Sequence, residues 1–86
     1  MKRTYKVVDE AGLHARPASL LAQVAGSKPN GVFIEYNDKR LTLKSIMVVM
    51  SLGVPSGAEF AIDVDGDDAK DVLDELEAVL VEHKVI

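Results

Sequence analysis

The sequence has no cysteine, no tryptophan and only two histidines among its 86 residues. The lack of cysteine excludes disulfides and thiolate metal sites, and the two histidines are too far apart in sequence to suggest a metal cluster, so no metal or cofactor is expected. No apolar run approaches the roughly 20 residues of a membrane-spanning helix, and residues 1–6 lead into a strand instead of a signal-peptide core. We therefore expect a cytoplasmic protein without membrane insertion.

The formal net charge of −4 is unevenly distributed along the chain. Residues 1–44 carry eight Lys or Arg against four Asp or Glu, whereas residues 45–86 carry two against ten. This balance argues against direct nucleic-acid binding. The basic half could meet an acidic partner protein, or the asymmetry could reflect only a solvated acidic face on the last helix.

Apolar periodicity and turn residues divide the chain into seven elements. Alternation predicts strands over 2–8, 32–36, 40–43 and 59–65, with a hairpin turn over 37–39. Helical spacing and capping residues predict helices over 15–25, between Ser45 and Gly53, and from Ala69 to a last turn at His83. The order predicts one α+β domain over residues 1–86, with three helices on an antiparallel sheet; a ferredoxin-like sandwich with an added terminal helix is the alternative.

The start of the first helix carries the only reactive-looking histidine. Pro17 fits only the first turn of a helix, which places the helix start at about His14. There the free N–H groups of Ala15 and Arg16 and the helix dipole favour an anion and a neutral, nucleophilic imidazole. A phosphoryl group on His14 could then pair with the Arg16 guanidinium. The alternative is that His14 is a helix cap or a partly buried loop residue and Arg16 a solvated charge.

The short helix after Lys44 offers a second candidate site. Ser45 is a good N-cap, and on residue type alone it is only that. The apolar residues of so short a helix cannot all point inward, so an exposed, adaptable patch is predicted. Because the hairpin returns this helix toward the first one, both are expected to share one docking surface. Its predicted members are Ala18, Ser19, Leu20, Ile46, Met47 and Met50.

Two segments at this spacing resemble the HPr family, the histidine-containing phosphocarriers of the bacterial phosphoenolpyruvate-dependent sugar phosphotransferase system. Residues 12–18 (GLHARPA) are similar to the family's active-site signature. Residues 44–53 (KSIMVVMSLG) are similar to the regulatory-serine segment of its Gram-positive branch. The resemblance covers essentially the whole chain. It implies an open-faced β-sandwich of order β-α-β-β-α-β-α, with a four-stranded antiparallel sheet and three helices on one face.

The resemblance also implies a function, that of a phosphoryl carrier and not of a stand-alone enzyme. His14 would accept a phosphoryl group on Nδ1 from enzyme I and pass it to sugar-specific IIA proteins, with Arg16 as its charge partner. Ser45 would be phosphorylated by an HPr kinase/phosphorylase, and the protein would then bind a catabolite-control repressor. A monomer is expected.

Two positions depart from the family pattern. Ala11 stands where a small polar residue is usual, which puts a side-chain phosphate ligand in doubt, and Val48 stands where close relatives often have glycine, which could alter kinase or repressor recognition. Two other functions are considered. A purely regulatory binding module would be expected to lack His14, and an interaction domain without chemistry would tolerate its replacement. A hydrolase is disfavoured because no Gly-x-Ser-x-Gly turn is present.

Overall fold

The computed structural model describes residues 1–86 as one α+β domain of order β-α-β-β-α-β-α. The strands are β1 (Lys2–Lys6), β2 (Val32–Tyr36), β3 (Lys39–Thr42) and β4 (Glu59–Val64). The helices are α1 (Ala15–Gly26), α2 (Ile46–Ser51) and α3 (Ala69–Glu82). The strands pair antiparallel in the order β1-β4-β2-β3. The predicted fold class is confirmed, and the position of β1 at an edge excludes the ferredoxin-like alternative, in which β1 is central.

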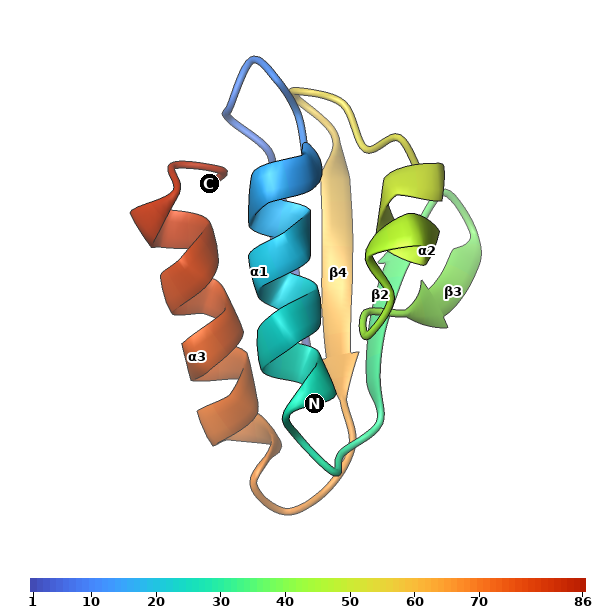
Figure 1. The fold of residues 1–86 in the computed structure, drawn as a ribbon, viewed down its shortest axis with the longest axis vertical. Coiled ribbons are helices and arrows are strands. Elements are labelled where there is room, and N and C mark those ends of the chain that lie inside the picture. Colours follow the sequence, from blue (N-terminus) through green and yellow to red (C-terminus); the bar gives the residue numbers. More distant parts are fainter.

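The three helices form one layer over one face of the sheet (Figure 1). α1 lies in the middle of this layer and contacts α3 on one side and α2 on the other. The core fills the space between the two layers. Its largest fully buried side chains include Phe60, Ile62, Ile34, Leu21, Leu43, Leu73, Leu76 and Leu80. None of the helices is long and apolar enough to span a bilayer.

α1 packs closely against α3 and α2, and its buried face is built mainly from small side chains. Ala18 and Ala25 are fully buried and Ala22 nearly so, alongside Leu21. The helical spacing of the sequence correctly indicates a core-facing stripe, but Leu20 and Val24 are only half-buried at its margin. The close approach of α1 fixes where its N-terminal end lies.

Four predicted strand boundaries are wrong. β3 ends at Thr42 and β4 at Val64, each one residue early, and the other two have identifiable reasons. β1 ends at Lys6 instead of Val8, because the Val7 N–H donates to the Ala58 carbonyl at 2.9 Å and the Val8 N–H to the Val85 carbonyl at 2.7 Å. The β2–β3 turn has two residues instead of three. Asn37 and Asp38 both have positive φ, 53° and 65°, as the tight turns that suit the twist of a hairpin require. Lys39 is therefore the first residue of β3.

α1 ends one residue later than the predicted range of 15–25, and neither Gly26 nor Asp68 acts as the cap that its residue type favours. Gly26 is the last residue of α1 and does not terminate it in a left-handed conformation; the Ser27 hydroxyl instead donates to the Val24 carbonyl at 2.7 Å. Asp68 precedes α3 but makes no side-chain cap, because its carboxylate accepts a hydrogen bond from Asn30 at 2.6 Å. The predicted caps of α2 are confirmed: Ser45 is its N-cap, and Gly53 follows it with φ of 59°.

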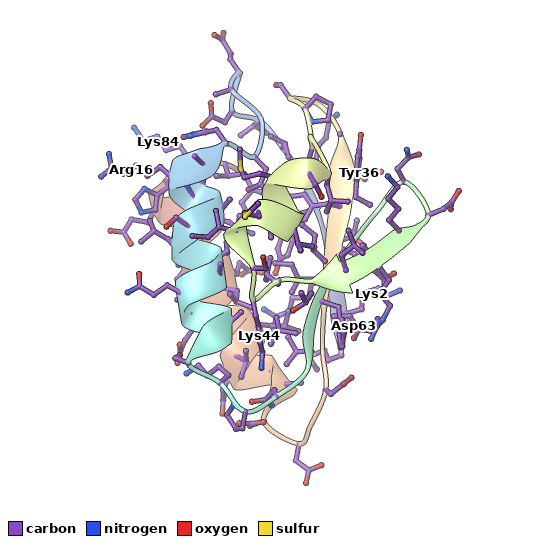
Figure 2. The ribbon with its side chains drawn as sticks, turned by 45° about the vertical axis from the view of Figure 1, so that its right-hand side comes forward. Lys2, Arg16, Tyr36, Lys44, Asp63 and Lys84 are labelled. Atoms are coloured by element: carbon purple, nitrogen blue, oxygen red, sulfur yellow. The ribbon has the colours of Figure 1, made fainter.

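The solvent-facing side of the sheet carries a charge network that joins all four strands. Arg40 on β3 donates to Glu35 at 2.7 Å and to Asp63 at 2.6 Å, and Lys2 on β1 donates to Glu35 at 2.8 Å. Lys2 and Asp63 lie on the side of the sheet away from α1 (Figure 2). Arg40 lowers the pKa of Asp63 below its usual value, and Lys2 and then Arg40 lower the pKa of Glu35.

We predict that Asp63→Asn reduces the acid sensitivity of the fold. Because the pKa of Asp63 is lower in the folded protein than in the unfolded chain, its ion pairs stabilise the fold above about pH 4, and this contribution is lost as the pH falls further. The melting temperature of the variant should be lower at neutral pH and should converge on that of the wild type between about pH 5 and pH 2. Asp67→Asn, at an exposed acid without an ion-pair partner, is the control; a similar response from both variants would contradict the prediction.

Candidate functional site

His14 is the N-cap residue of α1, with φ of −86° and ψ of −178°. Its side chain makes no capping hydrogen bond and is 39% exposed. The first bonded amide of the helix is that of Ala18, which donates to the His14 carbonyl at 3.1 Å. The N–H groups of Ala15 and Arg16 have no partner in the helix and are available to an anion at this end, as the sequence predicts.

The loop before His14 is fixed by a close backbone approach. Gly12 has φ of 69°, and a Cβ atom at this position would lie 2.5 Å from the Val54 carbonyl oxygen. That same oxygen accepts the Leu13 N–H at 3.0 Å, and the Leu13 side chain is buried in the core. Glycine is needed here both for its conformation and for its lack of a side chain. The His14 side chain therefore projects from the surface, and the backbone that carries it is held in place by these contacts.

Asp9 belongs to the site, although the sequence analysis did not select it. Its Oδ2 lies 3.3 Å from His14 Nε2, while its Oδ1 accepts the Ala11 N–H at 2.9 Å. An aspartate that accepts from the amide two residues ahead, before a glycine, is a common turn signal in sequences. That signal was available, but it does not reveal that the second carboxylate oxygen faces His14.

Arg16 lies in the exposed first turn of α1, and its guanidinium projects away from the body of the protein (Figure 2). It forms no ion pair within the chain. By contrast, Lys2, Arg3, Lys28, Arg40 and Lys70 all pair with carboxylates. The Arg16 side chain can therefore turn toward an anion bound at the helix end without breaking an existing contact.

α2 presents the exposed patch that its sequence predicts. Val49 is buried and anchors the helix, whereas Met47 is 84% exposed, Ile46 43% and Met50 39%. The Ser45 hydroxyl oxygen accepts the Val48 N–H at 3.4 Å, which confirms its role as a cap. Lys44 extends toward the opposite end of α1 from Arg16 (Figure 2) and donates to the Lys28 carbonyl at 2.9 Å.

One predicted member of the docking surface is wrong. Ala18 lies on the buried face of α1 and is fully buried, so its side chain cannot contact a partner. The error arises because alanine is small: on a helix it fits either a tight core contact or an open surface, so its residue type does not distinguish the two. Ser19 and Leu20 are half-buried, and α1 contacts α2 directly. We call the remaining set, Ser19, Leu20, Ile46, Met47 and Met50, the α1–α2 surface.

The whole chain is similar to a single group of known proteins. Residues 1–82 match the family described as the PTS HPr component phosphorylation site. The histidine-containing phosphocarrier protein of a Mycoplasma is 36% identical, with a TM-score of 0.95 over 100% of this chain and 98% of the other. The phosphocarrier protein HPr of Bacillus anthracis is 37% identical, with a TM-score of 0.81 over 92% of this chain and 94% of the other.

A third relative represents another branch of the same fold. Crh, a catabolite-repression protein of Bacillus subtilis, is 38% identical, with a TM-score of 0.70 over 95% of this chain and 93% of the other. It was crystallised as a dimer with a swapped domain. Fold and matched sequence together define a small phosphocarrier domain of the phosphotransferase system. The chain belongs to the HPr family.

We predict that Gly12→Ala destabilises the protein by about 1–3 kcal/mol, because alanine is strained at a positive φ and its methyl group would collide with the Val54 carbonyl. Urea denaturation at neutral pH measures this change. Gly26→Ala is the matched control: its added methyl group meets nothing within 4 Å, and it should stabilise α1 by roughly 0.5–1 kcal/mol. Equal stability of the two variants would contradict the account of the loop.

Proposed function

We propose that this protein relays a phosphoryl group from enzyme I to sugar-specific IIA proteins through Nδ1 of His14. The observation that carries the proposal is the position of this half-exposed imidazole at the N-terminus of α1, beside two free amide groups and an unpaired arginine. This combination provides a nucleophile and a binding site for the dianion that its reaction creates. Membership of the HPr family supports the same reading.

The proposed transfer requires few protein groups. The Nδ1 lone pair attacks phosphorus as the bond from phosphorus to the donor histidine breaks, and the donor, which is protonated on its other ring nitrogen, leaves as a neutral imidazole. Passage to a IIA histidine repeats the step in reverse. Phosphoryl transfer needs positioning and charge stabilisation more than covalent chemistry, and docking of two histidines in line supplies most of the positioning.

Arg16 and the free amides of Ala15 and Arg16 are the proposed phosphoryl ligands. A guanidinium can pair with two phosphoryl oxygens in a fixed geometry, and an amide at a helix end donates without reorganisation. Ala11 contributes no side-chain ligand, and its amide is already bonded to Asp9. The negative charge of phosphorylated His14 is therefore stabilised mainly by Arg16 and by the helix end.

We expect His14→Ala to abolish sugar phosphorylation in a system reconstituted with phosphoenolpyruvate, enzyme I and a IIA protein. Arg16→Ala should weaken transfer by about 1.5–3 kcal/mol, the range for a charge-assisted hydrogen bond, and Arg16→Lys should recover only part of the loss. Lys39→Ala removes an exposed cation from the distant β2–β3 hairpin and should have no effect. Relay through His14→Ala at the wild-type rate would refute the proposal.

The α1–α2 surface is the proposed docking site for both enzyme I and IIA proteins. Exposed methionines adapt to differently shaped partners, and this patch adjoins the helix that presents His14. Use of one surface for donor and acceptor implies that they compete. The remaining interface is supplied by polar groups around His14.

We predict that Met47→Glu raises the KM for enzyme I and for a IIA protein together, because it places a charge in the centre of the shared apolar patch. Val81→Glu makes the same change at an exposed valine of α3, on the other side of α1, and serves as the control. Loss of binding to only one partner would show that donor and acceptor use separate surfaces. Circular dichroism and melting curves establish that each variant is folded.

Ser45 is the proposed site of regulatory phosphorylation by an HPr kinase/phosphorylase, which would enable binding to a catabolite-control repressor. A phosphoserine at the N-cap of α2 gains stabilisation from the helix end and requires little refolding. Its charge would lie next to Ile46 and Met47, inside the proposed docking site. The Val48 N–H donates to the Ser45 hydroxyl, and we expect the bulk of the valine side chain to affect kinase recognition.

We predict that Ser45→Asp raises the KM for enzyme I more than it lowers the turnover of the bound complex, and that high salt weakens the effect. Ser45→Asn keeps a capping side chain without the charge and should behave like the wild type. If Ser45→Asp transfers as well as the wild type and no purified kinase of this type modifies Ser45, then Ser45 acts only as a cap.

A regulatory module without sugar-transport relay is the second candidate, favoured by the similarity to Crh. His14 and Arg16 support the carrier instead, since a purely regulatory member is expected to lack the histidine. The proposed form is a cytoplasmic monomer. Because Crh forms a swapped dimer, the oligomeric state should be measured by sedimentation. A monomer has the mass of one 9.3 kDa chain.

A further inference from the structure

We infer that Asp9 is a positioning residue that holds the proton of the His14 imidazole on Nε2 and so leaves the lone pair on Nδ1. This inference rests on the proposed function, because the selected nitrogen matters only if His14 accepts a phosphoryl group. The observation behind it is the distance of 3.3 Å between Asp9 Oδ2 and His14 Nε2. At this distance the two groups are within ion-pair range but are not aligned as a hydrogen bond, so the carboxylate favours a proton on the nearer ring nitrogen by its charge, and a turn of the exposed ring would complete the hydrogen bond that fixes the tautomer.

The Asp9 carboxylate is fixed by its own backbone and by the local turn. Its N–H donates to the Val85 carbonyl at 3.4 Å, and its carbonyl accepts the Gly12 N–H at 3.0 Å. Its Oδ1 accepts the Ala11 N–H at 2.9 Å. The two backbone contacts fix the residue, the contact with Ala11 orients the carboxylate, and the remaining oxygen faces the imidazole without an additional partner.

The interaction assists the transfer without moving a proton. When Nδ1 forms its bond to phosphorus and the bond to the donor breaks, positive charge develops on the His14 ring while Nε2 keeps its hydrogen. A carboxylate beside Nε2 stabilises this imidazolium, in the way that an aspartate supports the histidine of a hydrolase triad. In the onward step the ring departs as a neutral imidazole, since Nε2 is already protonated. A contact of 3.3 Å in the free protein can shorten when a partner docks.

The effect of the Asp9 carboxylate on His14 can be tested separately from its role in the turn that it forms with Ala11. Asp9→Asn retains an oxygen that can accept from Ala11 but turns an NH₂ donor toward Nε2, which favours the tautomer with the proton on Nδ1. Asp9→Ser also retains an acceptor for the turn and removes the carboxylate. Glu10→Gln neutralises the adjacent, exposed acid, which has no contact with His14, and serves as the control.

The first measurement is ¹⁵N NMR of the imidazole in the unphosphorylated protein at a pH where His14 is neutral. The wild type and Glu10→Gln should show the proton on Nε2, and Asp9→Asn should shift the population toward Nδ1–H. The second measurement is the rate of phosphorylation by enzyme I. It should fall about 10- to 100-fold in Asp9→Asn, less than the roughly 10⁴-fold loss in a triad with the wrong tautomer, because an exposed ring can still rotate.

Three outcomes separate the inference from the proposed function. An unchanged tautomer and an unchanged rate in both Asp9 variants would overturn the role of Asp9, while phosphorylation of wild-type His14 would still support the carrier. A lower rate with an unchanged tautomer would also overturn it, since that result fits only a disturbed loop. Failure of wild-type His14 to accept phosphate would refute the proposed function, and the NMR result would then decide the tautomer assignment alone.

Discussion

The start of α1 at His14 is the constraint on which the rest of the site depends. The helix lies in the middle of its layer, in contact with α2 and α3, and its buried face is rich in alanine. The chain can enter the helix at this point only because Gly12 adopts a positive φ against the Val54 carbonyl and Leu13 is anchored in the core. The packing of the core thus sets the direction in which the His14 imidazole projects from the surface.

The distribution of charge separates stability from function. On the open face of the sheet, Arg40 joins Glu35 and Asp63 in a closed network that involves neighbouring strands. Near His14, Arg16 has no partner within the chain and remains available to an incoming anion. The exposed methionine of α2, Met47, is similarly unused by the fold. Arg16 and Met47 are therefore available to the partners that the proposed relay requires.

The sequence predicted features set by local chemistry and missed features set by distant contacts. Pro17 located the start of α1, and the short length of α2 indicated that Met47 is exposed. Ala18 was assigned to the surface because periodicity does not reveal which small residues face a tight contact. The approach of Asp9 to His14 was missed because a turn signal does not reveal where the second carboxylate oxygen points. Tertiary packing decides the burial of Ala18, and the path of the loop decides the orientation of Asp9.

The central claim is tested most directly by incubating the purified protein with phosphoenolpyruvate and enzyme I and mapping the phosphorylated atom. The account predicts one phosphoryl group per chain, acid-labile and stable in alkali, on Nδ1 of His14. ³¹P NMR together with peptide mapping under alkaline conditions distinguishes Nδ1 from Nε2 and from a serine ester. Phosphate on any other residue, or no incorporation by a folded sample with active enzyme I, would contradict the account.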